Sequence, residues 1–192
     1  MADIFDVANY ILKISRDNTG DEDEEEDVDF ISNMKLQKLV YFCQGFFLAL
    51  CGKPLFPETI EAWKHGPVCP RLYQPLKIFG ASPITASIDP EKISLTEQER
   101  SIINMVYSTY RQYSSSGLRK ITHNDGPWKT TKIGTEISQK IMLQYFESLV
   151  EAPPKEIPLL SESEKYNLVK ILEQAEANGE IDLSRFCVPM GT

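Results

Sequence analysis

The sequence lacks the long apolar segments and the secretion signal that would indicate a membrane or exported protein. No stretch approaches the roughly 18 uninterrupted apolar residues that a membrane span needs, and the longest, residues 40–50, is broken by Gln44 and Gly45. The first residues have neither a basic start nor a small-residue cleavage site. We therefore expect a cytoplasmic protein that has no contact with a membrane.

Cysteine and histidine are scarce. The four cysteines, Cys43, Cys51, Cys69 and Cys187, do not form a Cys-x-x-Cys pair, and three of them stand in apolar sequence. We therefore expect buried free thiols in a reducing compartment, with no metal and no other cofactor. The two histidines, His65 and His123, lack the short spacing of a zinc site.

Basic charge of the kind that binds nucleic acid is not in excess, since the formal net charge is -8. Eight acids lie between residues 21 and 29, and without them the chain has 20 acidic and 20 basic residues. Because neutralised phosphates supply most of the affinity for DNA or RNA, nucleic acid is an unfavoured partner. The acidic run predicts a solvated loop insertion over residues 17–30. A calcium loop is the alternative, but Gly20 is not at the position that an EF-hand requires.

Apolar residues at helical spacing predict a mainly α fold, a compact multi-helix domain. The capping box at Thr96 to Glu99 and the Gly52 stop signal support two of the boundaries. Gly45 and Ala49 should allow another backbone to approach the central helix. We expect helices over residues 3–16, 34–51, 68–79, 96–113, 116–123 and 137–150, with Asp3 and Ser116 as caps, Pro75 kinking or splitting the third, and Ile141, Tyr145 and Leu149 facing the core of the last.

A small two-stranded β element is also expected, formed by residues 60–63 and 84–88. The proline-rich segment after Glu151 predicts a boundary between a domain of residues 1–151 and an appended part of residues 152–192. This part comprises the linker, a C-terminal helix that opens at Ser161 and closes at Gly179, and a tail.

Two segments place the histidines beside a Gly-Pro pair and a tryptophan: Trp63-Lys-His65-Gly-Pro67-Val and His123-Asn-Asp-Gly-Pro-Trp128. Three interpretations remain open. The histidines and tryptophans could be structural, in tight turns between helices. His65 or His123 could be a general base, with a cysteine as nucleophile or a metal. Nearby lysines and arginines could bind an acidic partner, a phosphate-bearing ligand or DNA, although a solvated surface is the simpler explanation.

Several blocks of the sequence resemble the SocA-like Panacea domain, a family that includes phage-associated GepA-like proteins. The resemblance covers about residues 5–150. It is carried by Met34-Lys-Leu-Gln-Lys-Leu-Val-Tyr-Phe-Cys-Gln-Gly45, Gly52-Lys-Pro-Leu-Phe56, Glu61-Ala-Trp-Lys-His-Gly-Pro-Val68, Leu72-Tyr73, Leu118, Thr122-His123 and Gly126-Pro-Trp128. The acidic run, Gly117 and the segment after the double proline depart from the family pattern.

The resemblance implies a helical antitoxin that is encoded beside a toxin and neutralises it by direct contact, without catalysis. It also implies that the antitoxin can deliver the toxin to the ClpXP protease. Aromatic residues flanked by cations are typical of binding hot spots. We therefore predict a toxin-binding surface formed by Trp63, His65, Pro67, Tyr73, His123 and Trp128. Whether the chain forms a homo-oligomer is left open.

Overall fold

The computed structural model describes residues 1–17, 31–86, 92–124 and 126–151. They form seven α-helices, one 3-10 helix and a two-stranded antiparallel hairpin, so the expected mainly α fold is confirmed. The elements are α1 (Ile4–Asp17), α2 (Asn33–Cys51), β1 (Glu61–Trp63), β2 (Gly66–Val68), α3 (Pro70–Leu76), η1 (Lys77–Phe79), α4 (Glu97–Tyr110), α5 (Ser115–Asn124), α6 (Gly126–Thr130) and α7 (Gln139–Glu151). The acidic loop, the C-terminal helix and the domain boundary after Glu151 concern residues outside these ranges.

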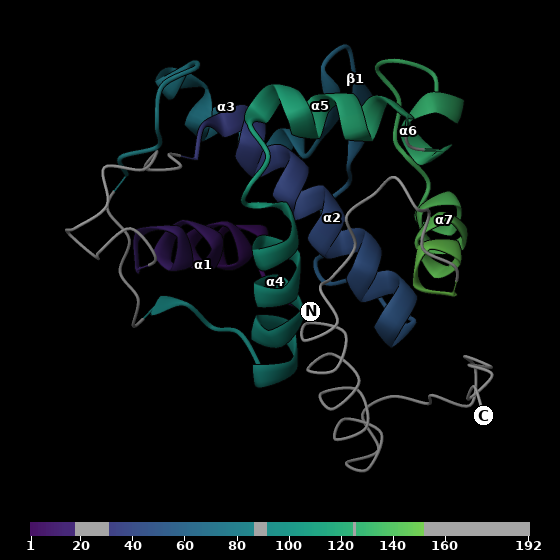
Figure 1. Cartoon of the computed structure of the whole chain (residues 1–192), viewed down its shortest axis with the longest axis horizontal. Helices are drawn as coiled ribbons and strands as arrows, with labels where there is room; N and C mark the ends of the chain where they lie inside the picture. The colour runs from purple at the N-terminus through teal and green to yellow at the C-terminus, as the bar shows by residue number, and fades with distance from the viewer. Residues whose placement is uncertain (18–30, 87–91, 125, 152–192) are drawn as a thin grey trace.

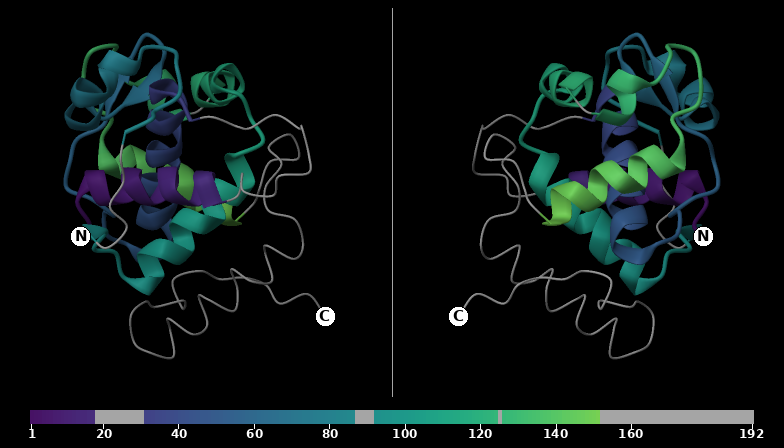
Figure 2. Two further views of the ribbon diagram at one scale, coloured as in Figure 1. Left: turned by 90° about the vertical axis from the view of Figure 1, so that its left-hand side faces the viewer. Right: turned by 90° about the vertical axis from the view of Figure 1, so that its right-hand side faces the viewer.

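Helix α2 lies at the centre of the molecule, and the other elements surround it (Figure 1). Between Asn33 and Leu50 only Met34 is exposed. This burial agrees with the sequence of α2, in which apolar residues occur on every side of the helix. Helices α1 and α4 lie on one side, α7 lies on the other, and α5 with the β-hairpin covers the N-terminal half (Figures 1 and 2). A helix that is buried on all sides packs against neighbours around its whole circumference, not only along one amphipathic stripe.

The predicted caps at Asp3 and Thr96 are confirmed, and Ser32 caps the start of α2. Asp3 Oδ1 accepts a hydrogen bond from the Phe5 backbone N at 2.8 Å, at the start of α1. Helix α2 begins after Ser32, and α4 begins with the complete capping box of Thr96 and Glu99. These signals are local, because each cap satisfies backbone N–H groups of its own first turn.

The predicted partner of the first strand is wrong. β1 pairs with β2 through a two-residue turn, with Trp63 opposite Gly66, and residues 134–137 hydrogen-bond to the other edge of β1. Ile84 instead donates its backbone N–H to the Ile31 carbonyl. The turn residues, Lys64 and His65, do not resemble the usual Asn-Gly signal of a hairpin, so the short-range pairing was missed.

Three helix details also differ from the sequence predictions. Helix α5 begins directly after Ser114, whose side chain accepts the Gly117 N–H, so Ser114 takes the capping role that we expected of Ser116. Helix α7 buries Met142, Phe146 and Leu149, whereas Ile141 is exposed and Tyr145 half-buried. The split predicted at Pro75, by contrast, agrees with the structure: Pro75 lies within α3, and η1 begins just after this helix ends. The short helix α6 was not expected.

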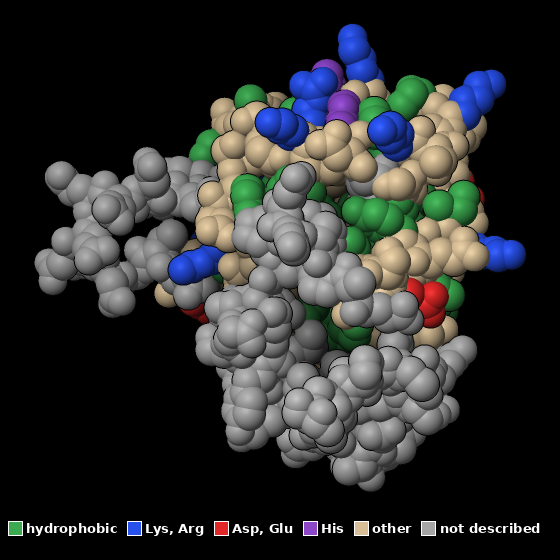
Figure 3. Space-filling view, turned by 45° about the vertical axis from the view of Figure 1, so that its right-hand side comes forward, with side chains coloured by type: hydrophobic (Ala, Val, Ile, Leu, Met, Phe, Trp, Pro, Cys, Tyr) green, Lys and Arg blue, Asp and Glu red, His purple; other side chains and the backbone are tan. Residues whose placement is uncertain are grey.

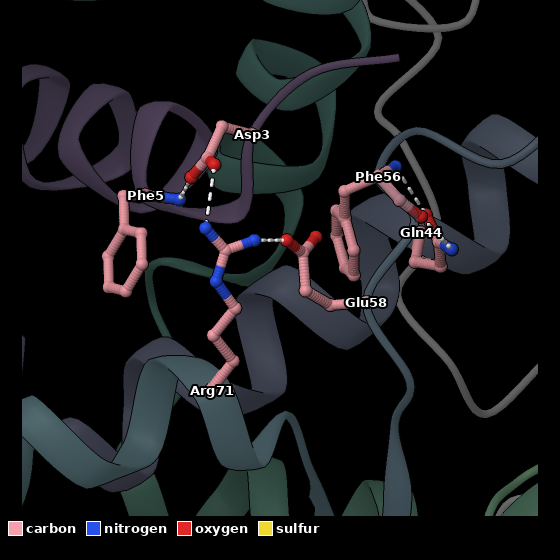
Figure 4. Close-up of polar contacts among 6 residues, drawn as sticks. All are labelled: Asp3, Phe5, Gln44, Phe56, Glu58 and Arg71. Atoms are coloured by element: carbon pink, nitrogen blue, oxygen red, sulfur yellow. Dashed lines mark hydrogen bonds and ion pairs between the residues drawn. The ribbon is translucent and has the colours of Figure 1, made fainter.

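The start of α1, the loop before β1 and the start of α3 are joined by one guanidinium group (Figure 4). Arg71 binds Asp3 at 3.0 Å and also binds Glu58, and its guanidinium lies 5.3 Å from the centre of the Phe5 ring. The Glu58 side chain is only 7% exposed, so its charge depends on Arg71 more than a surface carboxylate would. This ion-pair network fixes the position of α3, from which Tyr73 projects.

An aromatic cluster fills the space between α2, α4 and α7. Phe42 stacks on Tyr110 with ring centroids 4.1 Å apart, and the edge of Phe146 packs against Tyr41 and Phe46. A Cβ atom added at Gly45 would lie 2.2 Å from the Phe146 ring. The small residue that we expected to admit another backbone therefore admits an aromatic side chain.

We predict that Gly45→Ala destabilises the protein by about 1–3 kcal/mol, although alanine favours helix by up to about 1 kcal/mol. The reason is the overlap with Phe146, which is itself fully buried. Gly117→Ala in α5 is the matched control, because its added Cβ would meet nothing closer than 3.4 Å. Urea unfolding of both variants would test this; equal stability changes would contradict the packing argument.

Candidate functional site

The two Gly-Pro segments singled out in the sequence lie together, although they are about 60 residues apart. One forms the β1–β2 hairpin, and the other forms the end of α5 and α6, beside the hairpin (Figure 1). The Trp128 Nε1–H donates a hydrogen bond to the Trp63 backbone carbonyl at 2.9 Å. This bond joins the two segments directly.

Aromatic rings continue this contact across the surface. Trp63 and Tyr73 of α3 pack edge to face with their ring centroids 5.0 Å apart. The imidazole of His123 stacks on Trp128 with ring centroids 3.9 Å apart and an angle of 16° between the planes. Trp63, Tyr73, His123 and Trp128 are all half-buried. We name these four residues the aromatic row.

A buried lysine supports the row from below. Lys38 is 1% exposed, and its Nζ donates a hydrogen bond to the Pro67 carbonyl at 2.8 Å. Gly66 has a φ of 101°, and a Cβ there would lie 2.8 Å from Lys38 Nζ and 2.9 Å from Thr122 Oγ1. Only glycine fits this position, for both its backbone angle and its space.

Positive groups meet at this point. Burial, and after it the neighbouring charge of Arg119, lower the pKa of Lys38 to about 7. The pKa of His123 is lowered by burial and by the neighbouring charges of Arg119, Lys38 and His65. His123 is half-buried as a residue, but its Nε2 atom is buried and has no hydrogen-bond partner. A neutral imidazole is therefore favoured at neutral pH.

The six residues predicted as a binding surface are thus brought into one region but have different exposures. His65 is exposed in the hairpin turn, and the aromatic row is half-buried. Pro67 is buried, so it supports the surface and does not present its side chain to a partner. Lys38 was missed as a site residue, although a charge in the most apolar helix was the available signal.

The alternative interpretation as a Cys/His enzyme finds little support in this geometry. Burial raises the pKa of the Cys43 and Cys69 thiols, which disfavours the reactive thiolate. Within the described ranges, no three His, Cys, Asp or Glu side chains are placed to share a metal ion. None of the helices in the same ranges is long and apolar enough to span a bilayer.

Comparison with known proteins places this helical fold in a family. The family model described as "Antitoxin SocA-like, Panacea domain" matches residues 36–129. Antitoxin SocA of Caulobacter vibrioides (strain NA1000 / CB15N) is 31% identical over 157 residues, which cover 65% of this chain and 84% of that protein. No solved structure matches. The chain belongs to the SocA-like antitoxin family with a Panacea domain, as its sequence blocks predicted.

The matched region contains every element of the candidate surface. Residues 36–129 begin in α2 and end in α6, and so include Lys38, the hairpin, Tyr73 and the His123–Trp128 stack. Helix α1 and helix α7 lie outside it. The family pattern therefore coincides with the part of the fold that joins the two Gly-Pro segments.

We predict that Lys38 makes stability depend on pH. The pKa of Lys38 is about 7 in the folded protein and near 10.5 when unfolded, so between these values the unfolded chain binds the extra proton. The free energy of unfolding should therefore rise with pH across this window, by up to about 1.4 kcal/mol per pH unit from this residue. It should be lowest, from this residue, below pH 7.

Urea unfolding of the native protein and of Lys38→Met between pH 6 and 9 would measure this contribution as the difference between the two curves. The free energy of unfolding of the native protein should increase relative to that of Lys38→Met as the pH rises. Lys53→Met, at an exposed position, is the control and should give a curve parallel to that of the native protein. Parallel curves for Lys38→Met as well would contradict the proposed cost of burying a charged lysine.

Proposed function

We propose that this antitoxin neutralises a protein toxin by direct binding, through the aromatic row together with His65. The observation that carries the proposal is the meeting of the two Gly-Pro segments, which sets Trp63, Tyr73, His123 and Trp128 side by side on one surface. Membership of the SocA-like antitoxin family supports a toxin as the partner.

The composition of this surface favours protein recognition. Tryptophan, tyrosine and arginine dominate binding hot spots, because they bury a large area and lose little conformational freedom. The row is held before binding by the Trp128–Trp63 hydrogen bond and by the Lys38 contact below it. A preformed surface loses less entropy on association than one that must order first.

The surroundings of the His123 side chain favour a binding role over a catalytic one in this proposal. Within the described residues, His123 contacts an aromatic ring and like charges, with no carboxylate or thiol beside it to orient a proton transfer. General base catalysis needs such a partner or a bound substrate within hydrogen-bond reach. Contact area is the property that this arrangement supplies.

We predict that Tyr73→Ala and Trp128→Ala each weaken toxin binding by roughly 2 kcal/mol, the usual loss at an aromatic hot spot. The measurement is growth rescue when the chain is co-expressed with the product of the neighbouring open reading frame, followed by calorimetry of the purified pair. Tyr113→Ala is the matched control, because Tyr113 is also a half-buried aromatic residue but packs on Tyr110, away from the row.

All three variants should retain a folded circular dichroism spectrum before they are compared. If folded Tyr73→Ala and Trp128→Ala rescue growth as well as the native chain does, the row is not the binding surface. If the native chain itself gives no rescue and no binding, the proposed antitoxin mechanism is wrong for this pair.

Delivery of the bound toxin to the ClpXP protease, which the family resemblance implies, is a separate prediction. The half-life of the toxin in cells that also make this chain should lengthen severalfold when ClpX is removed. A half-life that does not change, with growth still rescued, would mean that binding alone inhibits the toxin.

A further inference from the structure

The surface around the aromatic row differs in charge from the rest of the chain. Residues 62–80 and 111–134 contain eight lysines and arginines and a single acid, Asp125, although the whole chain has a net charge of -8. Asp125 lies outside the described residues. The other parts of the sequence are therefore strongly acidic, and the basic residues are concentrated in the segments that build the proposed binding surface.

Five of these eight basic side chains gather on one face. Lys64 is exposed in the hairpin turn beside His65, Arg119 and Lys120 project from α5, and Lys129 and Lys132 follow from α6 and the next loop. Figure 3 shows lysine and arginine side chains around the two histidines at the top of the molecule, and the acidic side chains visible in this view lie lower. We name Lys64, Arg119, Lys120, Lys129 and Lys132 the basic rim.

No ion pair within the described part of the chain includes a rim residue, and the Glu61 carboxylate beside the row accepts its hydrogen bond from the Trp63 Nε1–H, at 2.7 Å. The ion pairs between described residues involve Lys13 with Asp17, and Arg71 with Asp3 and Glu58. Beneath the rim, the pKa values of Lys38 and His123 are lowered by burial and then by the charge of Arg119, so the field of the rim already acts on both groups. Basic side chains that converge without being paired to acids leave a positive potential at the surface.

We infer that the basic rim recognises an acidic protein surface, so that the toxin contacts this face through a cluster of aspartates and glutamates. The inference rests on the proposed function and adds the chemistry of the partner to it. The aromatic row would supply contact area at the centre, and the rim would supply attraction and orientation around it. This division matches the usual interface, with an apolar centre and a charged edge.

A nucleic acid is the competing polyanion, and the charge distribution disfavours it. A long phosphate backbone would extend beyond a rim of five residues onto a chain whose remaining segments are acidic. A compact acidic patch of a folded partner needs to match only the rim. The aromatic row also has one face of Trp128 covered by His123, which leaves less ring surface for stacking bases.

The test uses the full chain and two anionic probes of equal length, a peptide of ten glutamates and a ten-nucleotide oligothymidylate. Binding would be measured by fluorescence anisotropy at low salt for the native chain, for Lys120→Glu/Lys129→Glu, and for the control Lys13→Glu/Lys53→Glu. Both double variants change the net charge equally, but Lys13 and Lys53 lie outside the rim. All four positions are at least partly exposed, so both variants should fold.

We expect the native chain to bind the peptide more tightly than the oligonucleotide, and the rim variant to bind it roughly tenfold more weakly, with little change in the control. The affinity of the native chain for the peptide should also fall as salt rises. The inference is overturned by no peptide binding, by tighter binding of the oligonucleotide, by equal weakening in both variants, or by an affinity that ignores salt.

These outcomes are separate from those that test toxin neutralisation. A chain that rescues growth but ignores the peptide would retain the proposed function and lose the acidic partner. A chain that binds the peptide through the rim but gives no rescue would show the reverse.

Discussion

The fold depends on the complete burial of α2, because a helix with no solvent-facing side must satisfy its polar side chains within the protein. Lys35, Gln37, Lys38 and Gln44 are all 1% exposed. Each of them forms a hydrogen bond with the backbone of a loop, a strand or a helix end: Arg111, Cys69, Pro67, and Leu55 with Phe56. An unsatisfied buried polar group would cost about 1–3 kcal/mol, so these contacts also fix where the loops lie.

The candidate surface follows from the same constraint. Gln37 holds Cys69 at the start of α3, and Lys38 holds Pro67 in β2, so two successive residues of α2 fix the hairpin and the helix after it. Trp63 and Tyr73 then have defined positions, and α5 and α6 complete the surface from the other side. A surface built this way is rigid because its support is the core itself.

Much of this arrangement could be predicted from the sequence, and the failures share a physical cause. The caps at Asp3 and Thr96 and the end of α2 before Gly52 were predictable, because these signals act within one turn. The pairing of β1 with β2, and the face of α7 that is buried, were not. Both depend on contacts with distant segments, such as residues 134–137 along β1 and Phe146 against Gly45. Five residues of the predicted surface were proposed from the repeated Gly-Pro, histidine and tryptophan pattern and Tyr73 from the family blocks, but the burial of Pro67 and the support by Lys38 needed the fold.

Burying Lys38 in the core costs free energy, and the hydrogen bond that it donates to the hairpin gives this residue a specific role. A methionine or leucine at this position would fill similar space without the desolvation that lowers the lysine pKa to about 7. Only a donor, however, can bond the Pro67 carbonyl, and Gly66 leaves room for nothing larger than the lysine tip beside Thr122. The cost of burial is thus linked to one specific hairpin position. That position places Lys64 and His65 at the exposed turn and brings Trp63 within reach of Trp128. The buried amine of Lys38 therefore determines the geometry of the aromatic row, although Lys38 itself is not exposed on that surface.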